Sequence, residues 1–322
     1  AELAGVSRRS FLGASLAAAG AVHAAVATGQ DGPETEPPLD DDSMPCGMLG
    51  KTKLSRVFLG GNLIGGYMHC RDLSYVNQLF RAYATEEKII ETLKLAADNG
   101  INCVFESGAA AVAAYNKKYN GSMRFIPHIR PDASEQQLLD EIKMKVDLGA
   151  VALYCWGVHS DDLVRAGQVG KIAKAVEIAK RFDLPVGVGG HSLQVPVQCE
   201  KEKVACDFYV KTLHTDNYPS ATPKELRKDF MWSTGGEGWY DNMWCIDCEE
   251  TIELFKSIDK PWVAFKVLAA GALRPRQAFA HAFNNGADFI AVGMFDFQVK
   301  QNCDMIKRLV AREQNRSRPW RA

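Results

Sequence analysis

Short apolar segments alternate with amphipathic segments along most of the chain. Eight apolar segments predict strands, at residues 57–61, 102–106, 124–128, 151–155, 185–189, 207–211, 262–266 and 289–293. Apolar positions at helical spacing predict helices between them, for example over 86–98, 134–148, 169–182, 223–228 with 249–258, and 274–284. Strands that are apolar on both faces are typical of a parallel sheet covered on both sides.

The ends of the predicted helices carry matching stop signals. Asn99-Gly100, Leu148-Gly149 and Asn285-Gly286 supply residues that tolerate a left-handed conformation. Eight strand and helix units within about 240 residues favour a closed (β/α)8 TIM barrel, a single-domain α/β fold, over an open doubly wound sheet. The first βα turn, at residues 60–66, is Gly-rich but lacks the G-x-G-x-x-G dinucleotide fingerprint.

Two βα loops are expanded, the first at residues 67–85 and the sixth at 229–248. Both follow strands, so both are expected at the carboxyl-terminal end of the barrel, where active sites of this fold form. The sixth loop holds three tryptophans and a tyrosine. Such a loop suggests a lid or a wall on which a sugar stacks, but a packed surface loop or the interface of a homo-oligomer would use the same residues.

The N-terminal segment resembles an export signal. Arg8 and Arg9 precede Phe-Leu and an uncharged run over residues 13–27, which is too short and too Ala-rich for a good membrane span. The paired arginines resemble a bacterial twin-arginine signal, which implies the Tat translocase as a transient partner and a periplasmic or otherwise exported location. We therefore expect a signal peptide over 1–27, a flexible tether over 28–45 and the barrel over 46–322.

Composition narrows the functional classes. The chain is 47% hydrophobic and carries 38 basic and 39 acidic residues, so its net charge of -1 gives no case for a nucleic-acid partner. Nine cysteines, an odd number in a chain with a large core, do not predict a disulfide framework. Cys245 and Cys248 form one isolated C-x-x-C, which is compatible with a structural pair, a disulfide, or metal or redox chemistry.

Several segments resemble the aldo-keto reductase superfamily in order along the chain. Residues 49–60 resemble its opening hairpin and first strand, and 96–105 resembles the helix that leads into its second strand. The resemblance continues over 153–159, 186–192, 264–273 and 286–302. It covers nearly the whole predicted barrel and implies the same fold.

The catalytic tetrad implied by that resemblance is not retained. The family's Asp falls on Phe105, or on Glu106 with a one-residue shift, and its Tyr falls on Ala110 or Ala111. Carbonyl reduction by the family's route needs the Tyr as proton donor. The resemblance therefore predicts the barrel of a reductase without the reductase chemistry.

The remaining family positions point the same way. The tetrad Lys falls on His128, which leaves His159 as the plausible equivalent of the tetrad His. Val292-Gly293-Met294 and Asn302 match the last strand and helix, but residues that would bind a 2'-phosphate are not evident. We therefore expect that NADPH is not the cofactor.

Histidines gather at the predicted strand ends. Four of the seven follow the third to sixth strands, namely His128, His159, His191 and His214. Glu106 and Lys266 end the second and seventh strands, and adjacent strand ends of a barrel converge on one pocket. We therefore predict that His159, His191 and His214 share a divalent metal such as Zn2+, Mn2+, Fe2+ or Ni2+, completed by His128 or Glu106. Individual hydrogen-bonded histidines at the rim are the alternative.

Three functions follow from these observations. The leading hypothesis is an exported enzyme that moves protons on a small polar, sugar-derived substrate, with Lys266, Glu106 and His159 as catalytic residues and a metal assisting. It would be an isomerase, epimerase or lyase. The second is an NAD(P)-dependent aldo-keto oxidoreductase with an altered tetrad. The third is a non-catalytic binding subunit exported together with a partner.

Overall fold

A computed structural model describes residues 43–70, 73–228, 240–312 and 315–322. The expected signal peptide, with Arg8 and Arg9, and nearly all of the expected tether lie outside these residues, so export by the twin-arginine route stays a prediction. Residues Asp42–Ala322 form one compact unit. Within the described residues, no helix combines the length and the apolar character needed to cross a membrane.

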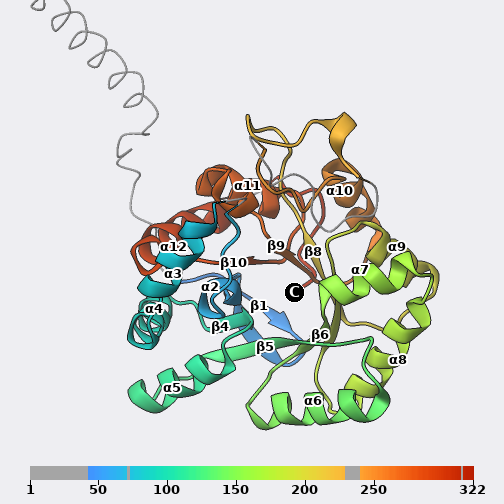
Figure 1. Cartoon of the computed structure of the whole chain (residues 1–322), viewed down its shortest axis with the longest axis horizontal. Coiled ribbons are helices and arrows are strands. Elements are labelled where there is room, and N and C mark those ends of the chain that lie inside the picture. Colours follow the sequence, from blue (N-terminus) through green and yellow to red (C-terminus); the bar gives the residue numbers. More distant parts are fainter. Residues whose placement is uncertain (1–42, 71–72, 229–239, 313–314) are drawn as a thin grey trace, which may run out of the picture. The chain divides into compact units, whose positions relative to one another are not determined.

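Eight parallel strands close into a barrel (Figure 1). They are β3 Val57–Gly60, β4 Cys103–Glu106, β5 Arg124–Ile129, β6 Leu153–Cys155, β7 Val186–Gly190, β8 Phe208–Thr212, β9 Trp262–Phe265 and β10 Phe289–Val292. Each strand pairs with the next along the chain, and β10 pairs with β3 to close the ring. The predicted (β/α)8 fold is confirmed, and every strand overlaps its predicted segment.

Helices surround the barrel. They are α2 Gly61–Ile64, α3 Ser74–Tyr83, α4 Glu86–Asp98, α5 Ala109–Tyr119, α6 Glu135–Asp147, α7 Gly157–Arg165, α8 Val169–Lys180, α9 Gln194–Lys201, α10 Cys248–Ser257, α11 Pro275–Asn284 and α12 Asp296–Ala311. Two begin with side-chain caps, at Thr85 before α4 and at Ser134 before α6. The helix predicted over 223–228 is a single 3-10 turn, Lys224–Leu226. None of its residues is buried, so no packing against the barrel stabilises a longer helix there.

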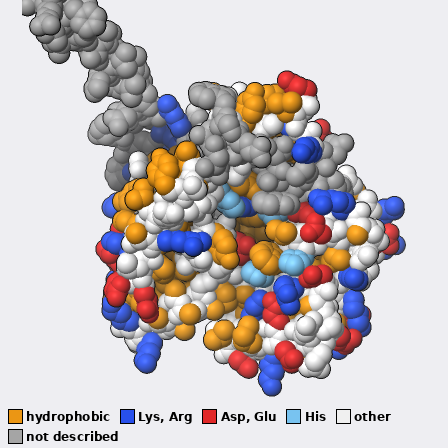
Figure 2. Space-filling model, viewed as in Figure 1, with side chains coloured by type: hydrophobic (Ala, Val, Ile, Leu, Met, Phe, Trp, Pro, Cys, Tyr) orange, Lys and Arg blue, Asp and Glu red, His pale blue; other side chains and the backbone are white. Residues whose placement is uncertain are grey.

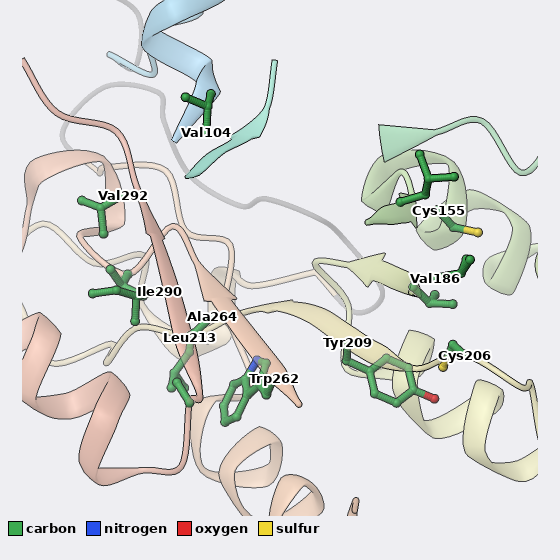
Figure 3. Packing of buried hydrophobic residues seen from close by; sticks show 14 of the residues in the cluster. Val104, Cys155, Val186, Cys206, Tyr209, Leu213, Trp262, Ala264, Ile290 and Val292 are labelled. Carbon is green, nitrogen blue, oxygen red and sulfur yellow. The ribbon is translucent and has the colours of Figure 1, made fainter. Parts of the chain in front are cut away.

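Two hydrophobic layers hold the barrel together. Alternate strand side chains point inward, and Phe58, Phe105 and Tyr154 stack across the interior with ring centroids 4.8 to 6.1 Å apart. The other strand faces pack against the helices, as Figure 3 shows for Val186 and Trp262. Both faces of each strand are thus buried, which explains their continuous apolar sequences.

The amino-terminal end of the barrel is closed. The hairpin of β1 Cys46–Leu49 and β2 Thr52–Ser55 places Leu49 and Leu54 against the interior residues. Beside it, the buried Asp288 carboxylate accepts a hydrogen bond from Arg318 at 2.5 Å, and Arg56 donates to the Asp288 carbonyl at 3.1 Å. The opening of the barrel is therefore at the carboxyl ends of the strands.

Candidate active site

A cavity of about 200 Å³ opens at the carboxyl ends of β3, β4, β9 and β10. Glu106 and Lys266 come from the strand ends, and Phe295 comes from the segment after β10. His69 belongs to the first expanded loop and Trp244 to the described part of the sixth. The two expanded loops therefore reach the carboxyl-terminal end, as predicted. Trp232 and Trp239 of the sixth loop lie outside the described residues.

Lys266 directly follows β9, and its ammonium group is buried in the cavity wall. Its Nζ lies 2.8 Å from Nε2 of His69 and 4.5 Å from the ring centroid of Trp244. Burial lowers the pKa of Lys266 to about 8, although Glu106 favours the charged form. A substantial fraction of the amine is therefore neutral near pH 8 and can accept a proton.

His69 holds that lysine while remaining uncharged. Burial first, and then the neighbouring charge of Lys266, lower the pKa of His69 to about 3. Lys266 and Asn62 both place side-chain N–H donors at Nε2, at 2.8 and 3.3 Å. Because Nε2 accepts, the proton of the neutral ring is on Nδ1. His69 thus orients the Lys266 amine through a hydrogen bond.

Glu106 is the acidic partner of this cluster. Burial raises the pKa of Glu106, and the opposite charge of Lys266 and a hydrogen bond from Trp156 partly offset that rise. The indole Nε1 of Trp156 donates to Oε1 of Glu106 at 3.3 Å. A carboxyl group with a raised pKa beside a lysine with a lowered pKa is suited to exchanging protons at near-neutral pH.

The backbone around this cluster is strained. Glu106, Lys266, Ala269 and Ala270 have φ angles of 81°, 56°, 46° and 56°, in the left-handed region that favours glycine. All four lie at or just after the ends of β4 and β9. Strain of about 1 to 3 kcal/mol per residue persists where the surrounding fold imposes it, commonly at functional sites. The turns that place Glu106 and Lys266 therefore set their positions at the expense of local stability.

The opposite side of the opening holds a second group of polar residues. The ring of His128 stacks on Trp156 at 4.3 Å between centroids, and His159 Nδ1 lies 2.9 Å from Asp132 Oδ1. Burial lowers the pKa of His128 to about 3. Figure 2 shows histidine side chains around the central hollow of this face, next to acidic and hydrophobic groups. His159 lies in the first turn of α7 and is about one quarter exposed.

His191 belongs to a buried pair. Its Nδ1 lies 2.8 Å from Oδ2 of Asp161, and the same carboxylate accepts backbone N–H groups of His191 and Ser192. Burial lowers the pKa of His191, while Asp161 opposes that change. The ring centroid of His191 is 5.1 Å from that of Phe265. Asp161 therefore fixes His191 behind the strand end that carries Lys266.

His214 anchors backbone. Its Nε2 accepts from the backbone N–H groups of Trp244 and Cys245 at 3.1 and 3.0 Å. Its Nδ1 donates to the Thr215 carbonyl at 3.0 Å. The lone pair that would bind a metal is thus engaged, and the physical role of His214 in this structure is to hold the Trp244–Cys245 segment under the cavity.

The predicted metal site is not assembled in the described part of the chain. No group of three or more His, Cys, Asp or Glu side chains there is arranged to hold a metal ion. The engaged lone pair of His214 gives one physical reason. Metal binding by His128, His159, His191 and His214 stays a prediction for metal analysis, whereas Lys266 and Glu106 do line one cavity, as expected.

Sequence reasoning missed His69 and underrated Trp244. His69 follows no strand end, so position in the barrel gave no signal, and its position inside an expanded loop was the only indication. Trp244 was part of the aromatic sixth loop, but nothing in the sequence set it apart from the other tryptophans. Both residues reach Lys266 only because their loops fold back over the barrel.

The similarity of this chain to known proteins is limited to the fold. Two solved structures of a putative aldo-keto reductase from Pseudomonas aeruginosa match 84% of this chain and 97% and 98% of their own chains. Each shares 14% sequence identity with it, and the TM-scores are 0.55 and 0.56. No family model and no curated protein matches the sequence. The comparison supports the (β/α)8 barrel fold alone, so the chemistry has to be argued from the site.

Proposed function

We propose that this protein is an enzyme that moves a proton on a small carbonyl compound, with Lys266 as the base. The observation that carries the proposal is the buried amine of Lys266, whose pKa is about 8, in the wall of a cavity of about 200 Å³. A base works best when its pKa is close to the working pH, and an ordinary exposed lysine is charged there.

The neighbours of Lys266 orient its amine and supply the proton donor. His69 orients the amine, and its neutral ring leaves the charge of the cluster to Lys266 and Glu106. Glu106, whose pKa is raised by burial, is placed to return a proton to the substrate. In this scheme Lys266 removes a proton from the carbon next to a carbonyl, and Glu106 protonates the oxygen where negative charge develops.

The cavity limits the substrate to a small molecule. Trp244, Phe265 and Phe295 give it apolar walls, and the polar groups are concentrated at Lys266, Glu106, His69 and Asn62. Aromatic faces beside a few polar groups are suited to small hydroxylated carbonyl compounds such as sugar derivatives. Isomerase, epimerase and lyase reactions of such compounds can each begin with this proton removal.

Deuterium exchange tests the proposal whichever product the complete reaction forms. The full chain would be incubated in D2O with a panel of small hydroxyaldehydes, hydroxyketones and 2-oxo acids, and exchange next to the carbonyl followed by NMR. We expect exchange that increases with pH through about 8, as Lys266 loses its proton. The Lys266→Met variant should lose about 100-fold to 10,000-fold of that rate, as is typical for removing a general base.

Lys171 provides a matched control, because it is an exposed lysine on α8, away from the cavity. The Lys171→Met variant should keep the full exchange rate. Equal rates for wild type and Lys266→Met on every exchanging compound would rule out Lys266 as the base. Tight NADPH binding, seen as quenched tryptophan fluorescence, together with carbonyl reduction would replace the proposal with the oxidoreductase alternative.

A further inference from the structure

Two cysteines lie behind the cavity wall with their thiols in contact. Cys245 follows Trp244, and Cys248 is the first residue of α10. The two side chains are hydrogen-bonded to each other and are free thiols. Cys245 is fully buried and Cys248 is 9% exposed. A C-x-x-C pair with its thiols in contact needs little movement to form a disulfide.

The surroundings lower the pKa of Cys245, whereas the hydrogen bond to Cys245 and burial raise the pKa of Cys248, so the proton between the two sulfurs lies on Cys248. The hydrogen bond from Cys248, followed by the nearby charge of Lys211, lowers the pKa of Cys245 well below its usual value against the effect of burial. The buried Nζ of Lys211 is fixed by hydrogen bonds to the hydroxyl and carbonyl oxygens of Thr212, at 2.8 and 3.1 Å. A thiolate is the reactive form of cysteine, so this environment differs from that of an inert buried thiol.

Cys248 has its own donor, on helix α11. The Sγ atom of Cys248 lies 3.4 Å from Nε2 of His281. Asn285 uses one amide to donate to the His281 carbonyl at 2.9 Å and to approach Nδ1 at 3.1 Å. Nδ1 therefore accepts, and the ring proton is on Nε2, which donates to the sulfur. His281 thereby stabilises negative charge on Cys248 when that thiol reacts.

We propose that Cys245 and Cys248 are a redox-active dithiol that forms an intramolecular disulfide by exchange with a small-molecule disulfide. Cys248, the more exposed sulfur, passes its proton to the Cys245 thiolate and attacks the external S–S bond, which releases one thiolate. That thiolate takes the proton from Cys245, whose sulfur then attacks Cys248 and expels the second thiolate. The two cysteines are oxidised, and the external disulfide is reduced to two thiols.

The pair is connected to the cavity through Trp244. The Trp244 carbonyl accepts a hydrogen bond from Thr212 at 2.8 Å, and its ring lies against Lys266 and His69. A disulfide between Cys245 and Cys248 would therefore form directly next to Trp244, which lines the cavity. The thiol chemistry itself is independent of the proposed proton transfer, so the two proposals can fail separately.

Mass spectrometry can test this directly, because trypsin releases the peptide 229–256, in which Cys245 and Cys248 are the only cysteines. The reduced full-length protein would be equilibrated anaerobically with oxidised and reduced glutathione, quenched with acid, alkylated, digested and weighed. We expect this peptide to escape alkylation and to weigh about 2 Da less than the reduced form, owing to the loss of two hydrogens. Cys199 and Cys206, buried thiols whose pKa values burial raises, are internal controls that should stay alkylated.

Single variants test the order of steps. Cys245→Ser should trap one glutathione on Cys248, because the resolving sulfur is missing, whereas Cys248→Ser should trap none. In the Cys245→Ser background, His281→Leu should slow trapping about tenfold, and His281→Gln, which keeps an N–H donor, should slow it less. Full alkylation of the wild-type peptide in every glutathione buffer would overturn the proposal. So would equal trapping by both single variants, or stoichiometric zinc that protects both thiols.

Discussion

The two sides of the barrel opening contain similar residues in different physical settings. On the side of β4 and β9, His69, Glu106 and Lys266 are in one buried cluster around a cavity. On the side of β5 and β6, His159 and Asp132 form a partly exposed pair beyond the stacked rings of His128 and Trp156. Burial lowers the pKa of Lys266 to about 8 on the first side.

The difference shows that residue type at a strand end does not by itself make a catalytic group. A titratable side chain becomes useful near neutral pH when burial and a specific partner move its pKa, and these conditions meet at Lys266 and Glu106. Trp156 links the two sides, because it donates to Glu106 and stacks on His128. Variants on each side and at Trp156 test whether burial accounts for the difference between the two sides.

The largest effect is expected for the stability of Lys266→Met. Lowering the pKa from 10.5 to about 8 means that the buried charge costs about 3 kcal/mol of folding free energy below pH 8. Methionine removes that charge at similar volume, and the buried Glu106 can become neutral by protonation. We expect the free energy of unfolding at pH 7 to rise by up to about 3 kcal/mol, measured by urea denaturation.

The stability difference between wild type and Lys266→Met should depend on pH. The folded protein loses the Lys266 proton before the unfolded chain does, so wild-type stability increases between pH 8 and 10.5. The advantage of Lys266→Met should therefore be complete below pH 8 and shrink across that range, and Lys171→Met should show no such trend. A variant less stable than wild type at pH 7 would contradict the claim that the buried charge is costly.

A smaller effect is expected at the link between the two sides. Trp156→Phe keeps an aromatic ring beside His128 but removes the donor to Glu106, so the pKa of Glu106 should rise further and that of Lys266 should fall. A base of lower pKa and an acid of higher pKa each transfer protons more slowly, so the limiting rate at high pH should fall. Because the 3.3 Å hydrogen bond is long, we expect that fall to be at most about tenfold. The rising limb of its pH profile should move to lower pH. An unchanged profile would show that the two sides are independent.

The smallest effect is expected on the exposed side. His159→Ala removes the partner of Asp132 and a ring whose centroid lies 4.9 Å from that of Trp156, but it leaves His69, Glu106 and Lys266 in place. We expect less than about a twofold change in the exchange rate, because the contact between His159 and Asp132 is partly exposed and neither residue lines the cavity that holds Lys266. A loss comparable to that of Lys266→Met would restore His159 as the catalytic residue predicted from the sequence, and metal analysis of both variants would then test the metal hypothesis.

The pattern of apolar and amphipathic segments is enough to predict the barrel and to identify the end at which its opening lies. The eight apolar segments had to be buried on both faces, and their alternation with amphipathic helices leaves few other folds. That order also identified the end that carries Glu106 and Lys266, since Glu106 ends its strand and Lys266 directly follows one. Periodicity is a local property, so local sequence was sufficient.

Which residues at the opening act together depends on contacts that the folded chain creates. His69 is 197 residues from Lys266 in sequence, and His281 is 33 residues from Cys248, yet each lies within hydrogen-bonding distance of its partner. The lone pair of His214 is used by backbone amides of a distant loop, which no strand-end rule could indicate. Burial, tautomers and pKa values depend on contacts between segments far apart in the chain, and such contacts exist only once the chain has folded.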